Sequence, residues 1–195
     1  MGLLQGQEQT LKGGEGISKL IEETQRKMEK LIHELLIPGV TMVITHHHLA
    51  DILKQALKQA RFPLLSKYKN REVEVLDCKG WMSKKDANGM MARLAEKAEK
   101  SPSLIVVIEN IADVWSDTSC EDPQYVENLF GHSWKNEQIY FGDCYIDRSQ
   151  MTIILSAGPE HKDELEQKYR IDPYGWIEDF DVEFDALQNV MKNRC

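Results

Sequence analysis

SLIVVIEN, residues 103–110, is the most apolar segment of this 195-residue chain and decides its fold class. A continuous apolar run is typical of a parallel strand covered on both faces, because a strand with one wet face alternates polar and apolar residues. Three further segments have strand character: VTMVIT at residues 40–45, EVEVLDC at 72–78 and MTIILSAG at 151–158. Together the four segments predict a central, mostly parallel sheet.

Segments with helical spacing of apolar residues separate these strands. Residues 17–35 and 46–59 each carry one apolar face, and a third helix is expected from the capping-box spacing at residues 83–86 until Ser101-Pro102. Strands that alternate with helices predict an α/β fold, a doubly wound sheet flanked by helices. The first helix either packs on the core or docks on a neighbour, and core packing is favoured.

The two ends of the chain are harder to interpret. Residues 1–14 contain several glycines and few apolar residues, which predicts a flexible leader before a single domain at 15–195. Near the C-terminus we expect helices at 161–169 and 186–192, with a last strand around 180–184. The acidic stretch WIEDFDVEFD is either an edge strand protected by its charges or a surface for a basic partner.

Composition excludes several functional classes. Hydrophobic residues at 42% and charged residues at 29% are globular values, and no apolar run reaches the roughly 20 residues of a membrane span. The net charge of −8 disfavours nucleic acid as a partner. No secretory signal is recognisable, so free thiols and a cytoplasmic location are expected. Cys120, His132 and Cys144 do not fit the spacing of a zinc site, and we expect neither a metal nor a cofactor.

Two stretches resemble the AAA+ ATPases of the P-loop NTPase superfamily. In that family an acidic strand end runs into a loop and helix, and a turn of the form hydrophobic-Asp-x-Ser-x-hydrophobic-Thr precedes the sensor strand. Here LIVVIENIADVWSD (104–117) corresponds to the first and YIDRSQMTIILSAG (145–158) to the second. The resemblance covers roughly residues 40–158 and is closest to Lon-like members. It implies an AAA+ core without a lid, with the nucleotide loop at residues 40–60.

The elements that this family uses to hydrolyse ATP are altered. A nucleotide loop needs glycine amides and a lysine around the phosphates, but this turn has neither. The catalytic glutamate is replaced by an amide, which cannot act as a general base, and the sensor asparagine is absent. The degenerate positions are Thr45, His46, His47 and His48 in the turn, Glu109 and Asn110 after the acidic strand, and Gly158 at the sensor. The resemblance therefore implies a core with no catalytic residues for ATP hydrolysis.

Other functions for these polar residues are open. The three histidines at a helix N-terminus could bind an anion or a metal, but consecutive residues point in different directions, so a polar helix start is favoured. Glu109 and Asn110 could form a polar pocket with Asp77 or simply cap the following turn, and capping is favoured.

Aromatic residues concentrate in one segment and predict a protein interface, where Trp and Tyr are enriched. They are Trp115, Tyr125, Phe130, Trp134, Tyr140, Phe141 and Tyr145. The resulting hypothesis is a non-catalytic AAA+-like pseudo-ATPase that binds a protein partner or its own copies as a regulatory or assembly subunit. The alternatives are a nucleotide switch without hydrolysis, an enzyme or metal-binding protein unrelated to ATP, and a clamp-loader-like subunit that contacts DNA.

Overall fold

The computed structural model describes residues 3–59, 63–79, 84–116, 138–141, 144–147, 149–163, 175–177 and 180–192. Its centre is a five-stranded sheet in the order β2-β3-β6-β1-β7, and all described pairings in it are parallel. The strands are β1 (Gly39–Ile44), β2 (Val73–Asp77), β3 (Ile105–Glu109), β6 (Thr152–Ala157) and β7 (Gly175–Ile177). The predicted α/β fold with a parallel sheet is confirmed, and each of the four expected strands is present within a residue or two.

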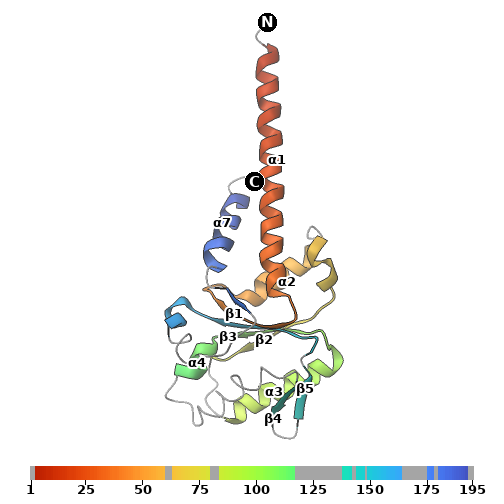
Figure 1. Ribbon diagram of the computed structural model, residues 1–195, viewed down its shortest axis with the longest axis vertical. Coiled ribbons are helices and arrows are strands. Elements are labelled where there is room, and N and C mark those ends of the chain that lie inside the picture. The colour runs from red at the N-terminus through yellow and green to blue at the C-terminus, as the bar shows by residue number, and fades with distance from the viewer. Residues whose placement is uncertain are drawn as a thin grey trace.

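Helices cover both faces of this sheet (Figure 1). One face carries α1 (Leu3–Leu35), α2 (Leu49–Lys58), the 3-10 helix η1 (Pro63–Tyr68) and α7 (Phe180–Lys192). The other face carries α3 (Lys84–Lys100), α4 (Ile111–Ser116) and an antiparallel hairpin of β4 (Gln138–Phe141) and β5 (Cys144–Asp147). A short 3-10 helix, η3 (Pro159–His161), follows β6. None of the described helices combines the length and hydropathy of a membrane span.

The continuous apolar run of β3 is explained by the two cores that it separates. Ile105 and Val107 belong to the core under α1, α2 and α7, whereas Val106 and Ile108 belong to the core over α3 and α4. All four side chains are fully buried. A strand with no wet face has no position for a polar residue, which is why this segment indicates the fold so clearly.

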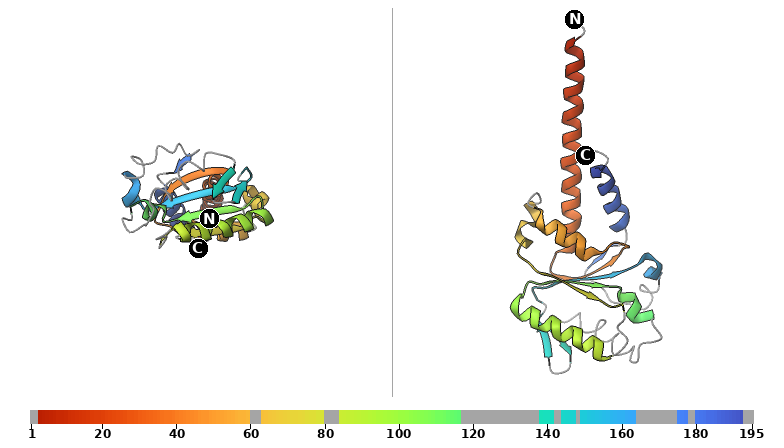
Figure 2. Two further views of the ribbon diagram at one scale, coloured as in Figure 1. Left: turned by 90° about the horizontal axis from the view of Figure 1, so that it is seen from below. Right: turned by 180° about the vertical axis from the view of Figure 1, so that it is seen from behind.

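Helix α1 begins at Leu3, so residues 3–14, for which the sequence predicted a flexible leader, belong to this helix. Leu4 and Leu11 lie seven residues apart, about two helical turns, and the glutamines around them are good helix formers. The C-terminal part of α1 packs as expected, with Leu31, Ile32 and Leu35 buried. The N-terminal part extends well beyond the rest of the described chain (Figures 1 and 2).

The C-terminal region also differs from the prediction. Residues 180–184 are the start of helix α7 instead of a strand, because Phe180, Phe184 and Leu187 recur at helical spacing and all three are buried. The edge strand is the earlier β7, next to β1. Of the helix expected at 161–169, only residues up to 163 are described.

Candidate functional site

The carboxyl ends of β1, β3 and β6 meet at one edge of the sheet, where ligands bind in open α/β folds. Thr45 directly follows β1, and its amide donates to the carbonyl of Ala157 at 2.9 Å. Glu109 is the last residue of β3, and Gly158 follows β6. The fold thus brings the degenerate positions named from the sequence to a common edge.

The turn between β1 and α2 is closed by a carboxylate from α7. Asp181 accepts hydrogen bonds from the Thr45 hydroxyl and from the backbone amide of His46, the latter at 2.8 Å. The amide of His47 donates to Thr45 Oγ1 at 2.9 Å, which fixes the hydroxyl that points at Asp181. Two donors at the expected nucleotide loop, the Thr45 hydroxyl and the His46 amide, are therefore already bound to a carboxylate of the chain itself.

His47 anchors α7 from a second direction. Its Nε2 atom lies 3.0 Å from Asp185 Oδ1 and 3.8 Å from Asp181 Oδ1. The edge of its ring meets the Phe184 ring with centroids 5.1 Å apart, and the Phe180 ring at 6.2 Å. We call this group of contacts the α7 clasp, and it comprises Thr45, His46, His47, Phe180, Asp181, Phe184 and Asp185.

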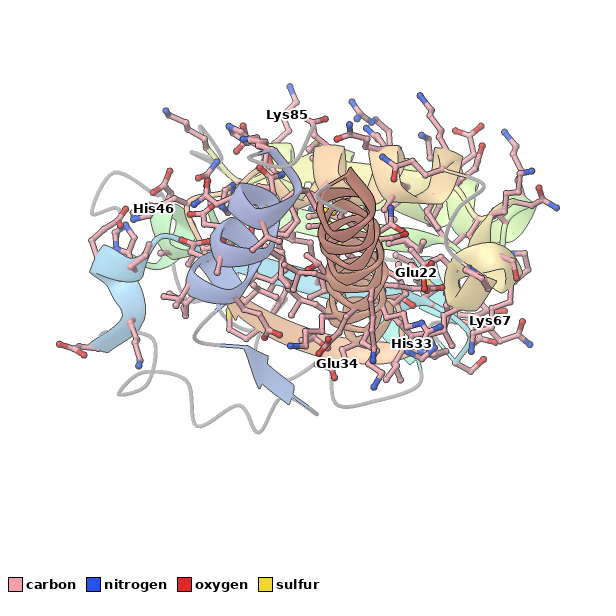
Figure 3. The ribbon with its side chains drawn as sticks, turned by 90° about the horizontal axis from the view of Figure 1, so that it is seen from above. Glu22, His33, Glu34, His46, Lys67 and Lys85 are labelled. Carbon is pink, nitrogen blue, oxygen red and sulfur yellow. The ribbon has the colours of Figure 1, made fainter. Side chains whose placement is uncertain are left out.

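The three consecutive histidines do not converge. His48 is 78% exposed, with Nδ1 3.5 Å from Glu109 Oε2, while His47 turns towards α7. His46 lies on the opposite side of α7 from α1 (Figure 3). Among the described residues no three His, Cys, Asp or Glu side chains are grouped to hold a metal. Helix α2 begins at Leu49 with His48 as its N-cap, three residues later than the sequence suggests.

The side chain of Asn110 binds Asp77, the residue named in the pocket alternative, and it is Asp77 that binds a backbone amide. Asn110 has a positive φ of 56°, a conformation that asparagine tolerates better than most residues. Its side-chain amide donates to Asp77 Oδ1 at 2.8 Å, and the same oxygen accepts from the Lys79 amide at 2.9 Å. These bonds hold the turns after β2 and β3.

Glu109 has a different environment from its neighbours. Its side chain is only 14% exposed. Oε2 faces His48, but Oε1 is buried without a hydrogen-bond partner among the described residues. This oxygen can accept a hydrogen bond from a donor, and as a carboxylate it opposes the approach of a phosphate.

At the sensor position, the Glu160 carboxylate lies against Gly158, so closely that a Cβ atom there would collide with it. The carbonyl of Gly158 accepts from the His161 amide at 3.0 Å and starts η3. With Glu109 and Asp181, this is the third carboxylate around the edge. The arrangement suits a cationic or hydrogen-bond-donating group better than a nucleotide.

The predicted aromatic interface is described only in part. Tyr140 and Tyr145 are direct partners across the β4–β5 hairpin, and Phe141 pairs with Cys144. Tyr145 is 59% exposed. Trp115 belongs to α4, and only the backbone of this residue is described. The other three aromatics (Tyr125, Phe130 and Trp134) lie outside the described residues.

No protein-family model matches the chain, and no curated protein matches it. The function is therefore argued from the site alone. The residues that sequence reasoning missed are Asp181 and Asp185. Their signal was the helical spacing of Phe180 and Phe184, which places the two aspartates one turn apart on a helix that can reach the turn after β1.

Replacing Asp181 with asparagine should loosen the α7 clasp. The carboxylate holds two donors at the β1–α2 turn, and an amide group can satisfy them only in part, so we expect a loss of about 1–3 kcal/mol in the free energy of unfolding. Urea denaturation measures this loss, and hydrogen exchange at residues 45–48 locates it. Glu183→Gln is the matched control, because Glu183 is an exposed acid in the same helical turn. An equal loss in both variants would mean that Asp181 acts only through the helix dipole.

Proposed function

We propose that this protein is a non-catalytic AAA+-like pseudo-ATPase that binds other proteins as a regulatory or assembly subunit. The observation that carries the proposal is the Asp181 carboxylate, which is bound to the hydroxyl of Thr45 and the amide of His46. Those are the groups that a phosphate would need at this turn.

The sheet order supports the AAA+ part of the proposal. If β1 carries the nucleotide loop, a bound nucleotide needs the acidic strand and the sensor strand beside it. β6, the sensor strand in the resemblance, pairs with β1 on one side and with β3, the acidic strand, on the other. A chain with that arrangement and no loop lysine has the framework of the site without its phosphate-binding chemistry.

The length of the turn supports the same conclusion. Only residues 45–48 separate β1 from α2. A loop that wraps a triphosphate needs several glycines with free amides, whereas here the His46 amide binds Asp181 and the His47 amide binds Thr45. The carboxylates of Glu109 and Glu160 add negative charge beside it.

The protein-binding part of the proposal rests on two surfaces whose exposure to water is energetically unfavourable. Tyr145 projects from the hairpin on one face, and the N-terminal part of α1 extends beyond the domain on the other. Large exposed aromatics and unpacked amphipathic helices are typical of interaction sites. A cytoplasmic location, which the cysteine content favours, is part of the proposal.

Native mass spectrometry with excess ATP and Mg²⁺ tests the proposal directly. We expect the mass of each chain to stay unchanged and no phosphate to be released on prolonged incubation. An Asp181→Ala variant frees the turn amide but adds no lysine or glycine, so it should also bind no ATP. A shift of one nucleotide per wild-type chain without hydrolysis would replace this proposal with the nucleotide switch, and phosphate release would make the protein an ATPase.

A further inference from the structure

An apolar groove lies among three helices on the face of the sheet that carries α1. It has a volume of about 630 Å³. Its apolar lining includes Met28 and Ile32 of α1, Ile52 of α2 and Phe184 of α7. Four glutamines surround these side chains: Gln25, Gln55, Gln59 and Gln188. Lys192 adds one charge to this polar rim, and an apolar floor within such a rim fits the apolar side of an amphipathic helix.

The α1 residues of this groove belong to a stripe that continues towards the N-terminus. Gln25 and Ile32 are seven residues apart, and the same interval leads back from Gln25 to Ser18, Leu11 and Leu4. Met28 is preceded in the same way by Ile21. Residues at intervals of seven lie along one line of a helix, so one stripe crosses both the packed and the projecting parts of α1.

The projecting part of α1 lacks support within the domain. Thr24 is still buried and Ile21 half-buried, and before them the helix extends away from every other described element (Figures 1 and 2). A helix of about 20 residues is marginally stable in water without tertiary packing. Ser18, which lies on the stripe, is exposed, and Leu20 on the other side of the helix is 38% exposed. There is thus space for a partner along this part of the helix.

We infer that the groove of one chain holds the N-terminal part of α1 from a second copy, and that the two α1 helices cross antiparallel. This deepens the proposed function by naming a partner. A second copy is favoured because groove and stripe lie on the same helix, so a single two-fold contact covers both of them twice.

The sequence fixes the register of this contact. If Leu4 of one chain meets Ile32 of the other, Leu11 meets Gln25 and Ser18 lies at the two-fold axis, because each pair of numbers adds to 36. Leu4 and Leu11 then lie over the groove. Gly14 falls beside the axis on the same side of the helix, where a small residue lets two helices approach closely. Leu4, Leu11, Ile21 and Met28 supply the apolar side chains of the contact, with Ser18 and Gln25 between them.

The oligomeric state of the full chain tests this inference. We expect light scattering after size exclusion to give twice 22.5 kDa for the wild type. The double variant Leu4→Glu/Leu11→Glu places two carboxylates in the apolar groove, so its dimer dissociation constant should rise by at least about 100-fold. The matched control is Gln5→Glu/Gln9→Glu, which adds the same charge on the opposite side of the helix and should remain dimeric.

Two single-cysteine variants test the register of the contact between the two α1 helices. Ser18→Cys places a thiol at the axis and should give a disulfide-linked dimer on mild oxidation, above the level of the parent chain with its own cysteines. Glu23→Cys lies on the opposite side of α1 and should not. Ser18 and Glu23 are exposed. For every variant, an unchanged melting temperature shows that the domain is folded.

Two results would overturn the inference: a wild-type mass of one chain at all concentrations, or a dimer that both charge variants leave intact. Either would be separate from a failure of the proposed function, which is read by nucleotide binding. A monomer that binds no ATP would leave the pseudo-ATPase proposal in place and remove only its partner.

Discussion

Replacing Arg71 with alanine should lower the free energy of unfolding by about 3–5 kcal/mol. The guanidinium of Arg71 donates to four backbone carbonyls where the chain enters the sheet. Its Nε atom binds Ser103, Nη1 binds Leu36 at 3.4 Å, and Nη2 binds Leu104 and Gln150 at 3.2 and 3.3 Å. These residues precede β1, β3 and β6, and Arg71 itself precedes β2.

Burial makes these carbonyl contacts necessary. It lowers the pKa of Arg71 from its usual range, because the charged form loses water, and the nearby Tyr68 offsets this only in part. Truncation would remove the charged donor from all four carbonyls, although those of Leu36 and Leu104 keep their bonds from Thr152. Urea denaturation followed by tryptophan fluorescence measures the effect.

Two variants serve as controls for the Arg71→Ala result. One removes an exposed arginine, and the other keeps the charge at position 71. Arg93→Ala removes an arginine that is 63% exposed and 4.0 Å from Glu74, so we expect a loss below about 1 kcal/mol. Arg71→Lys keeps the charge but reaches fewer carbonyls, and it should recover less than half of the loss. If Arg71→Lys is as stable as the wild type, a single point charge is sufficient and the four-carbonyl arrangement is not what matters.

Local sequence could not have indicated this role. Arg71 stands in the charged run KYKNREVE, and nothing in that run distinguishes it from Arg93. Its partners are 32 to 79 residues away along the chain. The strands were predictable because a buried parallel strand is apolar at every position, a property visible in the five consecutive residues 104–108.

The residues of the candidate site at the strand ends could be predicted from the sequence, whereas those of α7 could not. Parallel topology requires the ends of β1, β3 and β6 to meet, so Thr45, Glu109 and Gly158 were placed together from their positions alone. Asp181 is 136 residues from Thr45. Its role depends on α7 being a helix, and the alternation of acidic and apolar residues in WIEDFDVEFD favoured a strand instead.

The sequence did not predict the helix at residues 3–14, for a related reason. Glycine lowers the intrinsic helix propensity by about 1 kcal/mol per residue, and the segment has several of them. Propensity describes an isolated chain, however, and a helix that starts from the packed residues of α1 can continue without a new nucleus. The leucine spacing was the better signal.

Replacing Phe180 with alanine should cost about 3–5 kcal/mol, close to the effect at Arg71. Phe180 is fully buried, and its ring stacks on Phe184 with centroids 5.3 Å apart. The matched control lies two residues away: Val182 is 73% exposed, so Val182→Ala should stay within about 0.5 kcal/mol of the wild type. The same denaturation experiment compares them.

This pair also decides between helix and strand for residues 180–184. In a strand Phe180, Val182 and Phe184 would share one face and all three truncations would be costly. In the helix Val182 points away from the two phenylalanines, so only Phe180→Ala and Phe184→Ala should destabilise. A costly Val182→Ala would therefore contradict the helix and with it the α7 clasp.

Hydrogen exchange connects the same variants to the site. Because Asp181 follows Phe180 directly, loss of the Phe180 ring should release the carboxylate from the His46 amide. Exchange of that amide should accelerate in Phe180→Ala and stay at the wild-type rate in Val182→Ala, since only the first undocks α7. If the His46 amide stays protected when α7 is undocked, its protection comes from the turn itself. The β1–α2 turn would then exclude phosphate through its own geometry, without the carboxylate of Asp181.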